Sequence, residues 1–309
     1  MSWRDHFGMR GAPLPRGAAG ESFFDGDPHF QRLARAFAWL AAEPGIGVVT
    51  GEPGVGKSSA MRHLCRALPA SEHRVVYLSD CTVKPLDLYR MLAIELGLRP
   101  GPRAQIVTDI KQALVSLVDE RGIVPVIVLD DAQGLRDELL RELHGLTSLD
   151  FDGRDYLTVW LVGHPLLARR LRLQQHAALA QRIVWYAPMV AKTDPQLFGA
   201  MLDHGLTAAA APLDLITSDA RDLILRVSRG IPRLISHLLR ISLLLADERG
   251  LSSIDVSLVN SAAIVLHLEI TGMTRSDTRR RAGSPPGSPG SASPSCPRPR
   301  SACSGPSWR

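Results

Sequence analysis

The strongest signal in this chain is a stretch of eight residues, Gly51-Glu52-Pro53-Gly54-Val55-Gly56-Lys57-Ser58. It fits the pattern G-x-x-x-x-G-K-[ST] at every fixed position, and it directly follows the apolar run Ile46-Gly47-Val48-Val49-Thr50. Glycines let such a loop curl so that successive backbone N–H groups point at phosphate oxygens, and the following helix adds its positive N-terminal end. The alternative is an ordinary glycine-rich turn between a strand and a helix. The helical pattern from Ser58 to Leu68 favours phosphate binding, because the motif requires a strand before it and a helix after it.

This motif predicts a site for ATP and its magnesium ion. We expect Lys57 to contact the β- and γ-phosphates, and Ser58 to offer its hydroxyl to Mg²⁺, a hard cation that prefers oxygen ligands. The expected nucleotide-binding residues are those of the loop and of the first turn after it: Gly51, Glu52, Pro53, Gly54, Val55, Gly56, Lys57, Ser58 and Ser59.

A second signal lies further along the chain, where the apolar run Ile123-Val124-Pro125-Val126-Ile127-Val128-Leu129 ends in Asp130-Asp131-Ala132-Gln133. An apolar run closed by acids is typical of a buried parallel strand, and ligands bind at the carboxyl ends of such strands. We expect Asp130 to hold Mg²⁺ through water and Asp131 to orient or deprotonate the attacking water. The alternative is a pair of helix-capping aspartates at a strand end. The presence of the phosphate-binding loop favours the catalytic interpretation.

Length and composition indicate an intracellular protein with a sizeable core. The chain has 309 residues, of which 45% are hydrophobic, and its four cysteines show no metal-ligand spacing. We therefore expect a reducing, cytoplasmic location. The N-terminus carries charges and prolines without an apolar segment, and no stretch reaches the ~18 apolar residues of a membrane span. Neither export nor membrane insertion is expected.

The positive charge of the chain is concentrated at its C-terminus. From residue 271 onward seven arginines accompany one aspartate, a net charge of +6, whereas the whole chain carries +5. Residues 1–270 therefore carry about −1, so DNA contact by this part would need a local patch. The tail is a mixture of Ser, Pro, Gly and Arg that cannot bury enough surface to fold. It is either a basic arm for nucleic acid or a dispensable, even frameshifted, extension.

Strands and helices alternate as in an α/β protein with a parallel sheet covered by helices on both faces. The pattern predicts five strands, at residues 46–50, 74–78, 123–129, 157–162 and 182–186. From Pro195 to Leu268 all patterns are helical. We expect four parts: an N-terminal linker segment at 1–27, a nucleotide-binding α/β domain at 28–190, a small helical lid domain at 191–270 and a disordered tail at 271–309.

A five-strand α/β domain followed by helices is the layout of an AAA+ ATPase. Further motifs are His6-Phe7-Gly8-Met9 followed by Pro13, Thr50-Gly51-Glu52 at the loop, Leu161-Val162-Gly163-His164-Pro165-Leu166-Leu167, Gln181-Arg182-Ile183, and Ser228-Arg229-Gly230-Ile231-Pro232-Arg233. With these motifs the chain resembles, over residues 5 to 268, the bacterial ATPase group that includes the ExeA secretion ATPase and the TniB-like helper ATPases of DNA transposons.

The resemblance implies three further roles. Arg233 would be the sensor 2 residue that reaches the γ-phosphate from the lid, Arg182 an arginine finger for a neighbouring subunit's nucleotide, and His164 the sensor 1 residue. A guanidinium suits a developing phosphoryl charge because it is permanently cationic and binds bidentately. Chemistry alone does not select Arg182, since an expected helix nearby carries other candidates that alternatively form a solvated face: Arg169, Arg170 and Arg172. His164 is alternatively a hydrogen-bonded loop residue, and related proteins tend to carry glutamine there.

Asp131 departs from the pattern, because this group often has glutamate at that position. The shorter side chain withdraws the carboxylate by more than about an ångström, which is enough to change how it positions water. Asp-Asp pairs also resemble those of replication-initiator and helicase-loader ATPases, in which ATP acts as an assembly switch. We therefore expect a slow ATPase in which ATP binding sets the oligomeric state and hydrolysis resets it.

The resemblance leaves two biological roles open. A secretion ATPase of the ExeA type is expected to carry a membrane span and a cell-wall-binding domain after the ATPase, and neither follows here, so the transposition helper is preferred. In that role an ATP-loaded homo-oligomer coats double-stranded DNA and recruits or activates a transposase. Lys84, after the second strand, is the leading DNA-contact candidate, or else a solvated loop lysine. The competing expectation is a nucleotide-gated scaffold that binds a protein partner and no DNA, which the near-neutral residues 1–270 fit.

Overall fold

A computed structural model of the chain describes residues 3–15, 17, 22–79, 84–147 and 155–269. The predicted tail at 271–309 lies outside the described residues, as do residues 81–83 before Lys84. Backbone contacts group Met1–Thr271 into one compact unit. The internal boundaries expected near residues 27 and 190 stay predictions.

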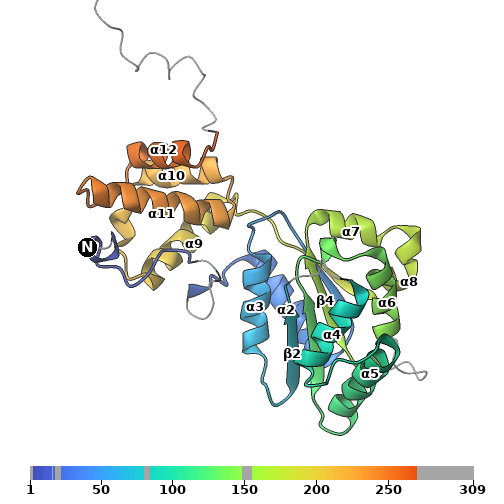
Figure 1. Cartoon of the computed structure of the whole chain (residues 1–309). Coiled ribbons are helices and arrows are strands. Elements are labelled where there is room, and N and C mark those ends of the chain that lie inside the picture. The colour runs from blue at the N-terminus through green and yellow to red at the C-terminus, as the bar shows by residue number, and fades with distance from the viewer. Residues whose placement is uncertain (1–2, 16, 18–21, 80–83, 148–154, 270–309) are drawn as a thin grey trace, which may run out of the picture. The chain divides into compact units, whose positions relative to one another are not determined.

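Five parallel strands form a single sheet in the order β2-β3-β4-β1-β5 (Figure 1). They are β1 (Ile46–Thr50), β2 (His73–Leu78), β3 (Val124–Leu129), β4 (Thr158–Gly163) and β5 (Ile183–Pro188). The register places Thr50 beside Gly163, and Leu129 beside Leu161. Strands β1, β3 and β4 therefore end at the same edge, which we call the carboxyl edge. Such an edge is where open α/β sheets bind their ligands.

Helices cover both faces of this sheet, which confirms the predicted fold class. One face carries α2 (Pro28–Ala42) and α3 (Lys57–Ala67), and the other carries α4 (Pro85–Glu95), α5 (Arg103–Asp119), α6 (Asp137–Thr147), α7 (Pro165–Leu171) and α8 (Ala177–Ala180). On the α2 and α3 face, Leu33 and Met61 pack in one apolar cluster with the fully buried Trp160 of β4. Burying one such large apolar side chain contributes roughly 1.5–3 kcal/mol, so these clusters hold the layers together.

Local chemistry sets several helix starts. Asp27 caps α2, because its carboxylate accepts a hydrogen bond of 3.0 Å from the backbone N–H of His29, and Pro28 occupies the first turn. Asp194 caps the helix α9 (Pro195–Ala208) in the same way through the N–H of Leu197, at 3.0 Å. Each cap of this kind stabilises a helix by about 1 kcal/mol.

The chain continues in helices: α9 (Pro195–Ala208), α10 (Ser218–Ser228), α11 (Pro232–Glu248) and α12 (Val256–Val265). These four helices share an apolar cluster of their own, which also contains Met9. The N-terminal segment is held to them by hydrogen bonds, since the Arg10 N–H donates to the carbonyl of Ala209 (2.9 Å) and the Ser236 hydroxyl donates to the carbonyl of Leu14 (2.8 Å). Phe7 and Met9 of the N-terminal motif pack against this same cluster.

Two four-residue helices, α1 (Trp3–His6) and α8, were not predicted, because a single turn is too short to show a periodic apolar pattern. In the part of the chain that the structure describes, no helix is both long enough and apolar enough to cross a membrane.

Candidate nucleotide-binding site

The glycine-rich loop connects β1 to α3 at the carboxyl edge. Gly54 has a φ of 88°, in the left-handed region that glycine adopts without strain. A Cβ atom on Gly54 would lie 2.8 Å from the Cβ of Arg233, and the N–H of Arg233 donates to the Gly54 carbonyl at 3.2 Å. Glycine is therefore required here both by the curl of the loop and by the close approach of α11.

Lys57 is the first residue of α3, and its side chain folds back along the loop. Its ammonium donates hydrogen bonds to the carbonyls of Gly51 (2.8 Å) and Glu52 (3.1 Å). Burial lowers the pKa of Lys57, the negative charges of Asp130 and Asp131 oppose this shift, and the positive charge of Arg233 adds to it. The half-buried ammonium lies where bound phosphate oxygens would replace the two carbonyls as its acceptors.

Asp130 follows β3 and is almost fully buried, with 3% of its surface exposed. One carboxylate oxygen accepts a hydrogen bond from the hydroxyl of Tyr77 (2.7 Å), and the other accepts from the N–H of Asp131 (3.0 Å). Burial raises the pKa of Tyr77, so the phenol stays protonated and remains a donor. The orientation of the Asp130 carboxylate is therefore set from two sides.

Asp131 is exposed beside Asp130 and has a left-handed backbone, with φ of 54°. Such a conformation costs ~1 kcal/mol for most residues, although aspartate tolerates it better than bulky ones. The side-chain amide of Gln133 donates to the Oδ1 atom of Asp131 at 3.1 Å.

His164 follows β4 and caps α7. Its Nδ1 accepts a hydrogen bond of 3.3 Å from the N–H of Leu166, so the ring proton is assigned to Nε2. Nε2 lies 3.1 Å from a carboxylate oxygen of Glu52. The predicted sensor 1 residue therefore contacts the glycine-rich loop directly.

One cavity of about 1050 Å³ collects these groups. Its lining includes most of the predicted site residues: Pro53, Gly54, Val55, Gly56, Lys57, Ser58, Ser59, Asp130, Asp131, His164 and Arg233. Its apolar lining includes Phe23, Phe24, Phe30, Met189 and Met201. Gly51 and Glu52 lie beside it: a Cβ on Gly51 would collide with the Met189 carbonyl, and Glu52 contacts His164.

The chemistry of the lining fits magnesium and ATP. The hydroxyl of Ser58 and the carboxylate of Asp130 are the hard oxygen donors that Mg²⁺ prefers, and it keeps several waters and phosphate oxygens besides. Curled glycines and an ammonium suit the phosphates, and the apolar lining suits a base. The volume lies at the upper end of the range for small-molecule sites.

Arg182 lies at the opposite end of the strands from this cavity. It directly precedes β5, whose first residue pairs with Ile46, so Arg182 lies at the edge opposite to the glycine-rich loop. Its guanidinium donates to the Thr147 carbonyl at 3.2 Å and lies 3.5 Å from Asp155. Contact between Arg182 and a nucleotide therefore requires a second copy of the chain.

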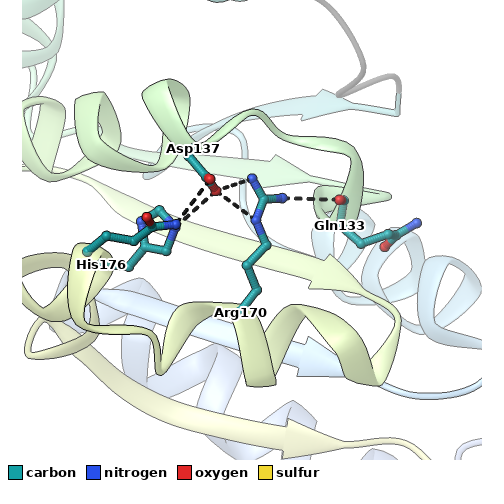
Figure 2. A network of polar contacts seen from close by, with 5 residues as sticks. Gln133, Asp137, Arg170 and His176 are labelled. Atoms are coloured by element: carbon teal, nitrogen blue, oxygen red, sulfur yellow. Dashed lines mark hydrogen bonds and ion pairs between the residues drawn. The ribbon is translucent and has the colours of Figure 1, made fainter.

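Arg170 of α7 is neither a solvated surface residue nor free to act as an arginine finger, because its guanidinium is bound within the chain. Its guanidinium binds the carboxylate of Asp137, with Nε to Oδ1 at 2.9 Å, and it also donates to the backbone carbonyl of Gln133 at 3.2 Å (Figure 2). The fully buried His176 side chain reaches the same carboxylate at 3.0 Å. The Arg170 guanidinium is the main reason that the pKa of Asp137 is lowered. Arg170 thus belongs to a structural network beneath the Asp131 loop.

Other residues at the site had no role assigned from the sequence. Besides Tyr77 and Gln133, a buried ion pair joins Lys192 to Asp27, which are 5% and 2% exposed and both line the cavity. Because Asp27 and Lys192 are so far apart in the chain, no sequence pattern indicates that they pair. Lys84 is exposed at the start of α4, and its contact with DNA stays a prediction.

Residues 41–171, from the end of α2 to α7, match the family model described as AAA domain. Together with the five-strand sheet and the site at its carboxyl edge, this match supports an AAA+ ATPase. Among curated proteins, General secretion pathway protein A of Aeromonas hydrophila is 28% identical over 257 residues, which are 82% of this chain and 47% of that protein. The chain thus spans about half the length of this relative.

Solved structures share the fold. Cdc6p from Pyrobaculum aerophilum superposes with a TM-score of 0.66 at 18% identity, over 86% of this chain and 72% of that one. The Aeropyrum pernix ORC1 protein, solved in complex with DNA, gives 0.62 at 18% identity, over 82% and 67%. At this level of identity the likeness concerns the fold alone.

Proposed function

We propose that this protein binds Mg·ATP in the cavity at the carboxyl edge and hydrolyses it slowly to ADP and phosphate. The observation that supports this most directly is the convergence of Lys57, Asp130 and Asp131 on one cavity from two separate strand ends. A cation for the phosphates, an oxygen ligand for the metal and a carboxylate for water are the groups that phosphoryl transfer to water needs.

Each residue then has a stated task. Lys57 binds the β- and γ-phosphates, while Ser58 and Asp130 hold the metal. Mg²⁺ held there would supply positive charge against the negative charge that develops on the phosphate. Asp131 orients the attacking water, and Arg233 and His164 contact the γ-phosphate. Because the backbone of Arg233 is bonded to Gly54, a change in the loop on nucleotide binding is transmitted to α11.

Phosphate release by the full chain tests this activity. We expect wild type to turn over ATP only with Mg²⁺, Asp131→Asn to lose about 100-fold in kcat while still binding ATP, and Lys57→Ala to lose binding. Lys111→Ala on α5 is the control, because Lys111 is outside the cavity lining. Equal rates in wild type, Asp131→Asn and Lys57→Ala would contradict the assignment.

For the biological role, we propose an ATP-switched homo-oligomer that binds double-stranded DNA and acts with a transposase as its partner. Support comes from the position of Arg182 at the opposite edge of the sheet, which suits contact with a neighbouring subunit, and from the shared fold of an ORC1 protein solved with DNA. Binding would be independent of sequence and sensitive to salt, since arginine and lysine would contact phosphates.

A second candidate is a secretion-associated ATPase, which the match to General secretion pathway protein A favours. In that role, or as a nucleotide-gated scaffold, the partner is a protein and DNA binding is absent. The near-neutral charge of residues 1–270 fits this alternative.

Fluorescence anisotropy of a labelled random-sequence duplex separates the two roles. The full chain and a chain ending at residue 270 are titrated in ATP, ADP and no nucleotide, beside Lys57→Ala. The shorter chain removes the +6 charge of the tail. Binding that needs ATP, weakens with salt and disappears in Lys57→Ala supports the DNA role. Absence of binding in all states, with ATP binding confirmed, favours the protein-partner role.

A further inference from the structure

Gln133 connects two of the candidate catalytic groups through the two ends of one amide. Its Nε2 donates to Oδ1 of Asp131 at 3.1 Å, and its Oε1 accepts from the backbone N–H of His164 at 2.9 Å. We propose that Gln133 is the positioning residue that orients the Asp131 carboxylate toward the attacking water. This inference rests on the proposed ATPase activity and names a further residue for it.

The conformation and exposure of Asp131 explain why its carboxylate needs a hydrogen-bond donor to orient it. Its carboxylate is exposed, stands on a left-handed residue, and is shorter than a glutamate by one methylene. A free aspartate side chain would turn among several rotamers, and orientation errors of this kind lower catalysis strongly. The amide of Gln133 occupies Oδ1, whereas within the described residues no donor reaches Oδ2. The second oxygen is therefore the one available to water.

The position of Gln133 is itself restrained by its surroundings. Its side-chain amide fits beside Gly163 only because that residue has no side chain, since a Cβ on Gly163 would lie 2.6 Å from Oε1 of Gln133. The backbone carbonyl of Gln133 accepts from Arg170, which is in turn held by Asp137 (Figure 2). A donor fixed in this way loses little entropy when it restrains Asp131, which is the advantage of preorganisation.

The alternative is that Gln133 only ties its loop to the end of β4 through His164. The two roles use opposite ends of the amide, so Gln133→Glu separates them. Glutamate has nearly the same shape and keeps an oxygen to accept from His164, but it cannot donate as a carboxylate and places a second negative charge beside Asp131. A structural tie survives this change, whereas orientation of Asp131 does not.

The experiment measures kcat and KM for phosphate release and the Kd of a fluorescent ATP analogue, using full-length wild type, Gln133→Glu and Gln133→Ala. We expect both variants to lose about tenfold or more in kcat, with KM and Kd changed less than about threefold. Gln105→Glu, the same chemical change on an exposed turn of α5, is the control and should match wild type. Preserved analogue binding shows that the variants are folded.

A double-mutant comparison completes the test. In an Asp131→Asn background, Gln133→Ala should cause no further loss of kcat, because the group that it orients is already gone. Gln133→Glu within about twofold of wild type, or a full additional loss in the Asp131→Asn background, overturns the positioning role alone. Wild type without Mg²⁺-dependent phosphate release overturns the ATPase proposal and the positioning role together.

Discussion

At the scale of single residues, Tyr77 orients the Asp130 carboxylate although Tyr77 is not part of the cavity lining. Its phenol donates to one oxygen of Asp130, the expected Mg²⁺ ligand, from the neighbouring strand β2. Groups that orient metal ligands in this way commonly change metal affinity when they are removed. The position of Asp130 is thus shared between β3, which places its backbone, and β2, which orients its carboxylate.

Tyr77→Phe removes this donor and keeps the ring. We expect the Mg²⁺ concentration needed for half-maximal ATPase activity to rise about tenfold, because the unrestrained carboxylate loses orientation. A Mg²⁺ titration of phosphate release at saturating ATP measures the shift. Tyr156→Phe is a matched control, since the Tyr156 hydroxyl also contacts an aspartate, Asp119, at 3.4 Å. An unchanged Mg²⁺ requirement in Tyr77→Phe would show that β2 does not influence the metal ligand.

At the scale of elements, the Asp137 network joins α6, α7 and the segment before α8. Asp137 stands in the first turn of α6 and binds Arg170 of α7 and the buried His176 together. This segment is followed by α8 and then by Gln181 and Arg182, which directly precede β5. One carboxylate therefore holds the helices that separate the Asp131 loop from the candidate arginine finger.

This network predicts a pH-dependent contribution to stability. The pKa of Asp137 is lowered in the folded state, mainly by hydrogen bonding to Arg170, from an ordinary value of 3.8. A group with a depressed pKa stabilises the fold above its unfolded value, and the contribution is lost as pH falls through the lower, folded value. Solvent exposure of Asp137 keeps the effect small.

Asp137→Asn should therefore lower the free energy of unfolding relative to wild type. The difference should stay constant from pH 7 down to about pH 4 and shrink below that. Urea denaturation followed by circular dichroism across this range measures it. Asp222→Asn, an exposed aspartate on α10, should show no such difference at any pH. If the difference in the free energy of unfolding between wild type and Asp137→Asn grew below pH 4, the pKa of Asp137 would not be lowered by folding.

At the scale of the whole molecule, the two edges of the sheet carry different halves of the expected catalytic apparatus. The glycine-rich loop and both aspartates lie at the carboxyl edge, and Arg182 lies at the other. Parallel strands make this separation unavoidable, because all of them start at one edge of the sheet and end at the other, so a residue before one strand and a residue after another lie at opposite edges. A finger at Arg182 can therefore act only between copies.

Mixing two inactive variants tests this arrangement. Arg182→Ala keeps an intact nucleotide site, and Lys57→Ala keeps an intact finger. Each alone should show little ATPase activity, while the mixture should regain a measurable fraction of the wild-type rate, because the finger is worth a large factor in phosphoryl transfer. Arg169→Ala on α7 should behave like wild type in the same assay. A mixture no more active than its components would remove Arg182 from the mechanism.

The sequence predicted the positions of the strands well but did not predict the contacts between side chains. All five strands were expected within a few residues of their observed bounds, because apolar runs of strand length reflect burial on both faces of a parallel sheet. Asp130 and Asp131 were identified for the same reason, since they end such a run. Gln133 was visible in the same four residues, yet nothing in a linear pattern shows that its amide turns back to Asp131.

The amino-acid sequence alone specified the strands, the longer helices and the glycine-rich loop, because turn chemistry, helix caps and apolar periodicity act over a few neighbouring residues. Only the tertiary structure decided which groups meet: the side chains of Tyr77 and Asp130, of Arg170 and Asp137, of Lys192 and Asp27, and the Gln133 side chain with the backbone N–H of His164. Such contacts depend on strand order, register and the packing of helices, all of which are set by burying the apolar core as a whole. Local patterns carry no record of these contacts.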